Sequence, residues 1–201
     1  MRYSPGHKEA TRKRLLELSS AMAKERGFDS MSVDTLMSAA GLTGGAFYAH
    51  FASKEELFVE IIGNELDRST RMLAPQEGQA PLEWVAKAFD NYLTVGHVRH
   101  PESGCVVPAL GAEIARAGPG VRKLYENAMT ALKDRWAEDI GDPEVAWAII
   151  CQLIGTIVVA RGMSSKRAME EIIHASRTHL DKTITAQIDT AQAAPETARK
   201  V

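Results

Sequence analysis

The chain has 201 residues, of which 45% are hydrophobic and 25% charged, and its formal net charge is −2. This length and composition are typical of a soluble protein with one large or two small domains and a buried core. Its two cysteines, Cys105 and Cys151, exclude a disulfide framework. We find no apolar run long enough to cross a bilayer and no secretory signal in residues 1–7, so we expect a cytoplasmic protein.

The first 14 residues form a basic arm. They hold five Lys and Arg side chains against Glu9 alone, which gives a local charge of +4 and leaves −6 for the remainder. An arm of this kind suits a protein that meets phosphate groups at one end. A solvated charged terminus is the alternative explanation.

Helical signals dominate the sequence, and strand signals are almost absent. The first predicted helix ends at Gly27 and has an apolar stripe formed by Leu15, Leu18, Met22 and Ala23. A second, short helix follows the N-cap residue Ser32 and ends at Gly41. Thr43 then caps a third, very short helix.

The fourth predicted helix opens with Ser53-Lys54-Glu55-Glu56, which has the form of a capping box, and runs to about Leu73. Residues 75–80 are the expected domain junction. Further helices are predicted from Pro81, over Cys105–Ala117, over Val121–Ile140, over Glu144–Arg161 behind Asp142-Pro143, and from the N-cap Ser164. Residues 97–104 are expected to be a loop and residues 189–201 a disordered tail.

Residues 32–54 carry the functional signal. Two short helices joined by Gly41-Leu42-Thr43 are typical of a helix-turn-helix, whose second helix enters the major groove of DNA. The residues from Thr43 to Ala46 are small, so the backbone can approach a duplex closely. The polar ends of the side chains that follow them in the sequence can reach phosphate oxygens. Short helix pairs of this kind also occur in proteins that do not bind DNA.

These residues resemble the TetR family of transcriptional regulators. The resemblance covers residues 8–68 and is carried by the run from Ala39-Ala40-Gly41-Leu42-Thr43 through Phe47-Tyr48-Ala49-His50-Phe51 to Ser53-Lys54-Glu55-Glu56-Leu57-Phe58. The phrase His100-Pro101-Glu102-Ser103-Gly104-Cys105 is similar to one subset of the family. The candidate DNA-binding residues are Arg12, Ser32, Thr43, Gly44, Gly45, Ala46, Tyr48, Ala49, His50 and Lys54.

The chain departs from the family pattern at three of these positions. Gly44 stands where many members have a long polar side chain, Ala46 where many have Thr or Ser, and Ala49 where many have Arg. Direct reading of base edges by side chains is therefore expected to be sparse. We expect DNA shape and phosphate positioning to supply much of the specificity.

The resemblance implies an all-α fold of about nine helices, with a three-helix DNA-binding domain over residues 8–68 and a helical dimerisation and ligand-binding domain over residues 75–188. The wide apolar arc of the helix over Glu144–Arg161 supports a homodimer independently. The core of a monomer is the alternative explanation. A two-fold dimer would bind double-stranded DNA at a pseudo-palindromic operator and act as a repressor.

Two mechanisms could release the protein from DNA. A small apolar effector could bind a cavity lined by Trp84, Phe89, Tyr92, Met129, Trp136 and Trp147, although side chains of this kind more often belong to an ordinary core. An electrophile or oxidant could instead modify Cys105, which stands at the start of a predicted helix behind His97 and His100. A buried packing role is the alternative for this thiol.

Two other functions compete with DNA binding. One is an enzyme that uses Cys105 with His97 or His100, although no third orienting group is recognisable. The other is a helical interaction protein that does not bind DNA. We expect no enzymatic activity, no metal site, no cofactor and no membrane partner.

Overall fold

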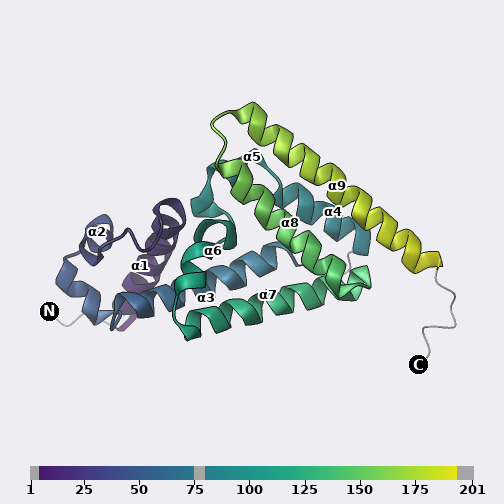
Figure 1. Ribbon diagram of the computed structural model, residues 1–201. Helices are drawn as coiled ribbons and strands as arrows, with labels where there is room; N and C mark the ends of the chain where they lie inside the picture. Colours follow the sequence, from purple (N-terminus) through teal and green to yellow (C-terminus); the bar gives the residue numbers. More distant parts are fainter. Residues whose placement is uncertain (1–4, 75–79, 194–201) are drawn as a thin grey trace, which may run out of the picture. The chain divides into compact units, whose positions relative to one another are not determined.

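The computed structural model describes residues 5–74 and 80–193, and every regular element in these ranges is a helix (Figure 1). The all-α prediction is therefore confirmed. By internal packing the chain divides into two compact units. Unit 1 consists of Met1–Ser69 and His100–Ala128, and unit 2 of Thr70–Arg99 and Met129–Val201. The predicted domains, 8–68 and 75–188, are continuous segments of the chain. In the structure, residues 100–128 instead pack with the N-terminal helices in unit 1.

Unit 1 begins with four elements in the predicted order: α1 (Pro5–Arg26), α2 (Val33–Ala39), the 3-10 helix η1 (Gly44–Ala49) and the first part of α3 (Lys54–Met72). The basic arm is helical from Pro5 onward. At the start of α3, the Ser53 hydroxyl accepts a hydrogen bond from the Glu56 amide at 3.1 Å. The Glu56 carboxylate accepts one in return from the Ala52 amide at 2.6 Å, so the predicted cap is present.

The remainder of unit 1 is formed by η2 (Pro101–Ser103), α6 (Val107–Arg116) and the start of α7 (Pro119–Ile140). The expected loop over residues 97–104 is wrong, because α5 (Val95–Arg99) and η2 occupy most of it. Helix α7 starts two residues before the predicted Val121, since Pro119 fits the first helical turn, where its missing N–H is not needed.

A buried ion pair joins α1 to α3. The Lys24 ammonium donates to the Glu65 carboxylate at 2.7 Å and to the Gly104 carbonyl at 3.2 Å. The Ser20 hydroxyl donates to the other Glu65 oxygen at 2.5 Å. Burial lowers the pKa of Lys24 from its usual value, and the bond to Glu65 opposes that shift. The pair is surrounded by an apolar core that includes Leu15, Ile61, Ile62 and Leu66.

Glu113 of α6 fixes the turn that follows α1. Its carboxylate accepts hydrogen bonds from the Phe28 amide at 3.0 and 3.1 Å and from the Asp29 amide at 3.2 Å. Gly27 ends α1 with φ of +85°, and a Cβ there would lie 2.8 Å from a Glu113 oxygen. This turn therefore requires glycine for its backbone conformation and for the space next to Glu113.

Unit 2 contains α4 (Pro81–Tyr92), α5, the end of α7, α8 (Pro143–Arg161) and α9 (Lys166–Ala193). Its aromatic core joins Trp84 edge-on to Trp136, with ring centroids 4.8 Å apart, and Phe89 to Trp136 at 6.1 Å. Both indole N–H groups are bonded, that of Trp84 to Asp139 at 2.7 Å and that of Trp136 to the Leu73 carbonyl at 2.9 Å.

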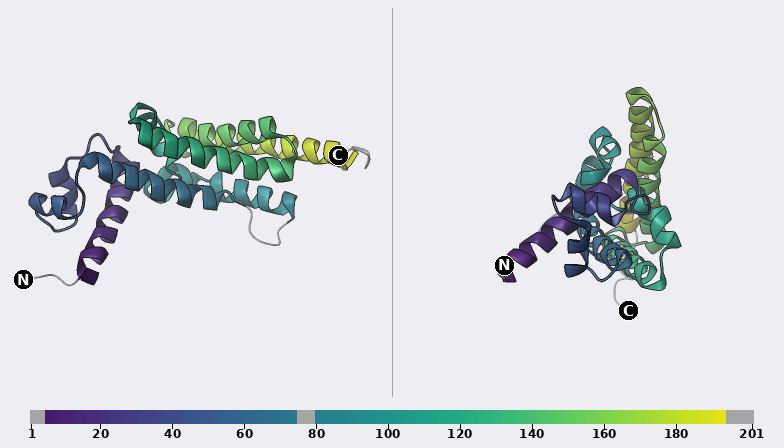
Figure 2. Two further views of the ribbon diagram at one scale, coloured as in Figure 1. Left: turned by 90° about the horizontal axis from the view of Figure 1, so that it is seen from below. Right: turned by 90° about the vertical axis from the view of Figure 1, so that its left-hand side faces the viewer.

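Helices α8 and α9 lie side by side in both figures, and α9 extends beyond α8 (Figure 2). Asp142 caps α8 as predicted, since its carboxylate accepts from the Glu144 and Val145 amides at 2.8 and 3.2 Å. Two details of α9 differ from expectation. Ser165 rather than Ser164 caps it, and it continues to Ala193, so residues 189–193 are helical. The rest of the predicted tail lies outside the described residues.

Helix α8 is apolar on two sides. By length and composition it could span a membrane, so the expectation that no run is long enough is wrong for Pro143–Arg161. That is weak evidence for a membrane helix, because core helices of soluble proteins meet the same criteria. One side of α8 packs against α5 and α9. The other side leaves an exposed stripe formed by Trp147, Ala148, Cys151, Val158 and Val159.

Candidate nucleic-acid interface

A tight turn joins α2 to η1. The Ser32 hydroxyl caps α2 by accepting from the Thr35 amide at 3.1 Å. Gly41 then adopts φ of +72°, in the left-handed region that favours glycine, and the Leu42 amide donates back to the Met37 carbonyl at 2.8 Å. The predicted helix-turn-helix connection is therefore present, and it ends α2 within one turn.

The segment behind this turn is a 3-10 helix with a small, exposed front. Thr43 stands at its N-cap position with an extended backbone, but its side chain makes no cap hydrogen bond, contrary to expectation. Thr43, Gly45 and Ala49 are exposed, and Gly44 and Ala46 are half-buried. Phe47 is fully buried, whereas Tyr48 exposes 68% of its surface. The backbone can thus approach a flat or grooved partner with little side chain in the way.

The structure gives a physical reason for glycine at position 44. A Cβ on Gly44 would lie 2.1 Å from a carboxylate oxygen of Asp34 in α2. Asp34 therefore occupies the space that a longer residue would need. Nothing in the local sequence pattern indicated this contact.

Arg12 is held by protein groups. It forms an ion pair with Glu60 of α3, donates to the His50 carbonyl at 3.3 Å, and lies 4.7 Å from the centre of the Phe51 ring. About a third of its side chain stays exposed, at 34%. In this position Arg12 fixes the end of η1 against α1 and α3. Glu60 was not anticipated, because only the fold brings it to Arg12.

His50 follows η1 and is half-buried. Its Nδ1 atom is buried, and no described residue hydrogen-bonds to it. Burial lowers the pKa of His50 from its usual value, and the positive charges of Lys8 and Arg12 lower it further. The imidazole is therefore predominantly neutral at pH 7, beside a cluster of positive charge.

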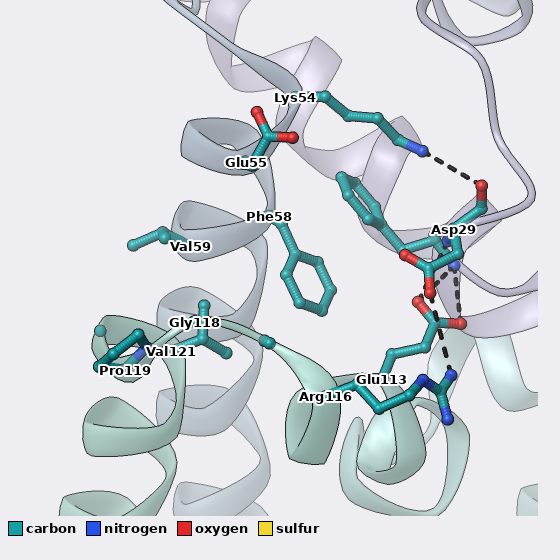
Figure 3. Close-up of a pocket in the computed structure, with 13 residues that line it drawn as sticks. Asp29, Lys54, Glu55, Phe58, Val59, Glu113, Arg116, Gly118, Pro119 and Val121 are labelled. Atoms are coloured by element: carbon teal, nitrogen blue, oxygen red, sulfur yellow. Dashed lines mark hydrogen bonds and ion pairs between the residues drawn. The ribbon is translucent and has the colours of Figure 1, made fainter.

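Lys54, the first residue of α3, points toward the turn after α1. Its ammonium donates to the Asp29 carbonyl at 3.3 Å and lies 4.7 Å from the centre of the Phe28 ring. Both of these partners are uncharged, and the Lys54 charge also acts on the neighbouring Glu55 carboxylate, whose pKa it helps to lower. This side chain also lines a pocket in unit 1 (Figure 3).

The candidate effector residues separate into two groups. Five of them are buried in unit 2: Trp84, Phe89, Tyr92, Met129 and Trp136. Of these five, Trp84, Phe89 and Trp136 form one aromatic cluster. Trp147 is 38% exposed on α8 and belongs to the exposed stripe instead. The apolar positions therefore form a core, and Trp147 does not join it.

Cys105 lies just before α6 in unit 1 and is only 2% exposed. The residue before it, Gly104, accepts a hydrogen bond from the Lys24 ammonium through its carbonyl. His100 of unit 1 is exposed and contacts Glu102 at 3.1 Å, whereas His97 of unit 2 is buried and bonds the Tyr92 carbonyl at 2.8 Å. Each histidine thus has a local partner of its own.

Comparison with known proteins gives the same assignment for the N-terminal region. Residues 15–61 match the family of "Bacterial regulatory proteins, tetR family". The chain is 42% identical over 62 residues to the HTH-type transcriptional repressor KstR2 of Mycobacterium tuberculosis, a match that spans 31% of each protein. It is 26% identical over 137 residues to the HTH-type transcriptional regulator UidR of Escherichia coli, which covers 68% of this chain and 67% of UidR.

The fold is also similar to that of solved regulators. The reduced form of NemR from E. coli superposes with a TM-score of 0.73 over 86% of this chain and 96% of that one, at 18% sequence identity. A transcriptional regulator from Rhodococcus sp. Rha1 gives a TM-score of 0.72 over 92% of this chain, at 21% identity. Residues 15–61 thus match a model of the tetR family of bacterial regulatory proteins, and the chain shares its fold with solved transcriptional regulators.

Proposed function

We propose that this protein is a transcriptional repressor that binds double-stranded operator DNA through η1 and the residues around it. The observation that carries the proposal is the exposed, small-residue front of η1 behind the tight turn at Gly41. Tyr48 and the backbone of residues 43–46 contact the groove, and Lys54 and His50 contact phosphates. The regulators KstR2 and UidR, to which the N-terminal region is similar, support this assignment.

The direct test is selection of genomic fragments that the purified protein retains at moderate salt. We expect a small set of fragments with pseudo-palindromic sequences. Retention that does not differ from that of mixed competitor DNA would contradict the proposal. It would favour one of the alternatives, a helical interaction protein or a cysteine-dependent enzyme, and a turnover assay with the thiols blocked separates those two.

Lys54→Ala tests the phosphate contact. We expect weaker binding to every duplex and a salt dependence reduced by about one unit of slope, because one fewer counterion is released. The measurement is operator affinity by gel shift over a range of salt concentrations. Lys166→Ala is the control, since Lys166 is an exposed lysine of α9 in unit 2 that pairs with Glu170. A sequence-selective loss in Lys54→Ala would argue against a phosphate role.

We further propose a soluble, cytoplasmic homodimer whose subunits meet along the exposed stripe of α8. Val158 and Val159 expose 49% and 52% of their surfaces there, and Cys151 and Ala148 keep the stripe thin enough for close approach. A second copy that covers this stripe would form a four-helix interface with α8 and α9 of both subunits. Two recognition segments would then lie about 34–36 Å apart or somewhat further.

Release from DNA follows from an apolar effector in unit 2 or from modification of Cys105. The first route requires the buried aromatic cluster of Trp84, Phe89 and Trp136 to open around the effector. The second is supported by the bond from Lys24 to the carbonyl of Gly104, the residue before Cys105, since a group added to this thiol would disturb the pair that joins α1 to α3. Alkylation of the Cys151→Ser variant should lower operator affinity, and alkylation of the Cys105→Ser/Cys151→Ser variant should not. Unchanged affinity in both would exclude the cysteine route.

A further inference from the structure

Unit 1 contains a pocket of about 350 Å³, formed by the turn after α1, the start of α3, the end of α6 and the start of α7 (Figure 3). Sites for small ligands in proteins span about 300–1,000 Å³, so this one suits a small molecule. Its walls are largely apolar and include Phe28, Phe58, Val59 and Val121. The rings of Phe28 and Phe58 are stacked, with centroids 4.4 Å apart.

The pocket is held open by fixed backbone. Glu113 binds the amides of Phe28 and Asp29, so the turn that forms one wall cannot move without breaking three hydrogen bonds. The opposite wall is formed by Gly118-Pro119-Gly120, and a Cβ on either glycine would meet nothing within 4 Å. A ligand can therefore enter without displacing packed side chains, which lowers the cost of binding.

Three carboxylates line the pocket, Asp29, Glu55 and Glu113, together with two cations, Lys54 and Arg116, so the preferred ligand charge depends on which of these groups are already paired. The carboxylate of Glu113 is saturated by backbone amides, and that of Glu55 is stabilised by hydrogen bonds from its own amide and from Ser53, which lower its pKa. Arg116 lies 3.9 Å from the Asp29 carboxylate. The Lys54 ammonium donates to the Asp29 carbonyl and lies over the Phe28 ring, and its charge also helps to lower the pKa of Glu55. No carboxylate of the described residues forms an ion pair with this ammonium at contact distance, so it can still pair with a carboxylate ligand.

We propose that this pocket binds a small aromatic carboxylic acid, with its ring against Phe58 and Val59 and its carboxylate on the Lys54 ammonium. An organic amine fits less well, because the carboxylates around the pocket already have partners while the cation does not. The site lies in unit 1, whereas the aromatic cluster lies in unit 2, where the cation over the Phe89 ring, Arg177, is already paired with Asp90 and Asp181.

The acid would also regulate DNA binding. This step rests on the proposed function, because it assigns Lys54 to a DNA phosphate. A carboxylate in the pocket and a phosphate on the duplex compete for one ammonium group, so each ligand lowers the affinity for the other by the same factor. The acid is therefore expected to release the repressor without any change in unit 2.

The test uses 1-naphthoate and the full-length protein in the absence of DNA. Titration calorimetry should detect binding to the wild type. Val59→Trp, which fills the pocket, and Lys54→Met, which removes the charge but keeps the bulk, should each weaken binding at least tenfold. Met72→Trp is the matched control: Met72 is 36% exposed on the same helix as Val59, which is 38% exposed, but does not line the pocket. Circular dichroism checks that every variant is folded.

Absence of binding to the wild type, or equal binding by the wild type and Val59→Trp, would overturn the proposal. Unweakened binding by Lys54→Met would also overturn it, because the carboxylate would then have another partner. A second titration with operator DNA separates the two proposals: 1-naphthoate should lower the operator affinity of the wild type and Met72→Trp but not of Val59→Trp. If the protein binds no operator, the calorimetric result still decides whether the acid site exists.

Discussion

Phe47 and Tyr48 are adjacent in η1, yet one is fully buried and the other is 68% exposed. Successive residues of a 3-10 helix are about 120° apart around the axis, so neighbours point in different directions. The Phe47 ring packs on Phe51 and supports the edge of Tyr48, with centroids 5.5 and 5.4 Å away. Phe47 therefore anchors the segment in the core, whereas Tyr48 is available to a partner.

His50 should make operator binding depend on pH. Its pKa is lowered in the free protein by burial and by Lys8 and Arg12. DNA phosphates would raise it again, so binding takes up a proton, and affinity should increase as the pH falls from about 7.5 to about 5.5. The increase is at most about tenfold per pH unit for one proton. Gel shifts across this range measure it, and the His50→Asn variant should lose this part of the dependence. An equal dependence in that variant would assign the effect to another group.

Gly27 and Gly41 form a matched pair for a test of stability. Both adopt positive φ, but a Cβ on Gly41 would meet nothing within 4 Å, while one on Gly27 would meet Glu113 at 2.8 Å. Gly41→Ala should therefore cost about 1 kcal/mol from backbone strain alone, and Gly27→Ala should cost more. Urea unfolding measures both free energies. Equal costs would show that Glu113 moves aside without loss.

At the scale of elements, α1, α3 and the segment before α6 are joined by polar groups inside an apolar core. Lys24, Ser20 and Glu65 lie on helices that contact each other, and the Gly104 carbonyl completes the coordination of Lys24. No local pattern indicated this network, because Lys24 and Glu65 are 41 residues apart. Glu113 similarly reaches an amide 85 residues away.

Glu65→Gln should strongly destabilise unit 1. It leaves Lys24 buried without a countercharge, and breaking a buried pair in this way costs about 3–5 kcal/mol. The pKa of Lys24 is already lowered by burial, and without Glu65 it should fall further. Because the unfolded state then binds the proton more readily, the variant should regain stability as the pH rises toward about 10. The double variant Lys24→Met/Glu65→Leu is the control and should be more stable than Glu65→Gln, as measured by urea unfolding.

At the scale of the whole molecule, helix α8 is apolar on two sides. The proposed homodimer gives the exposed side a role. The helix buries one side against α5 and α9 and leaves Trp147, Val158 and Val159 exposed. Large exposed apolar side chains at helical spacing usually mark an interface. A second copy of the chain would cover them and would link two recognition segments.

Val158→Glu/Val159→Glu should convert the protein to a monomer, because four buried charges would face one another across the two-fold axis. Sedimentation should change from a dimer to a particle of 21.9 kDa. Operator affinity should fall by about 10²-fold or more, since the two half-sites are no longer bound by one molecule. Leu124→Glu is the control: Leu124 is an exposed apolar residue of α7, and this variant should remain dimeric. A dimeric double variant would place the interface elsewhere.

The sequence by itself determined the helices other than α5 and η2, the tight turn before η1 and the residues at the front of that segment. Caps such as Ser32 and Asp142, glycines at positive φ and apolar spacing all act within a few residues, so they are readable without the fold. Only the tertiary structure decided why Gly44 must be small, what holds Arg12, how Glu113 fixes the turn after α1, and that residues 100–128 pack in unit 1. Each of these depends on contacts between different secondary-structure elements, most of them far apart in the chain, and no local pattern encodes them.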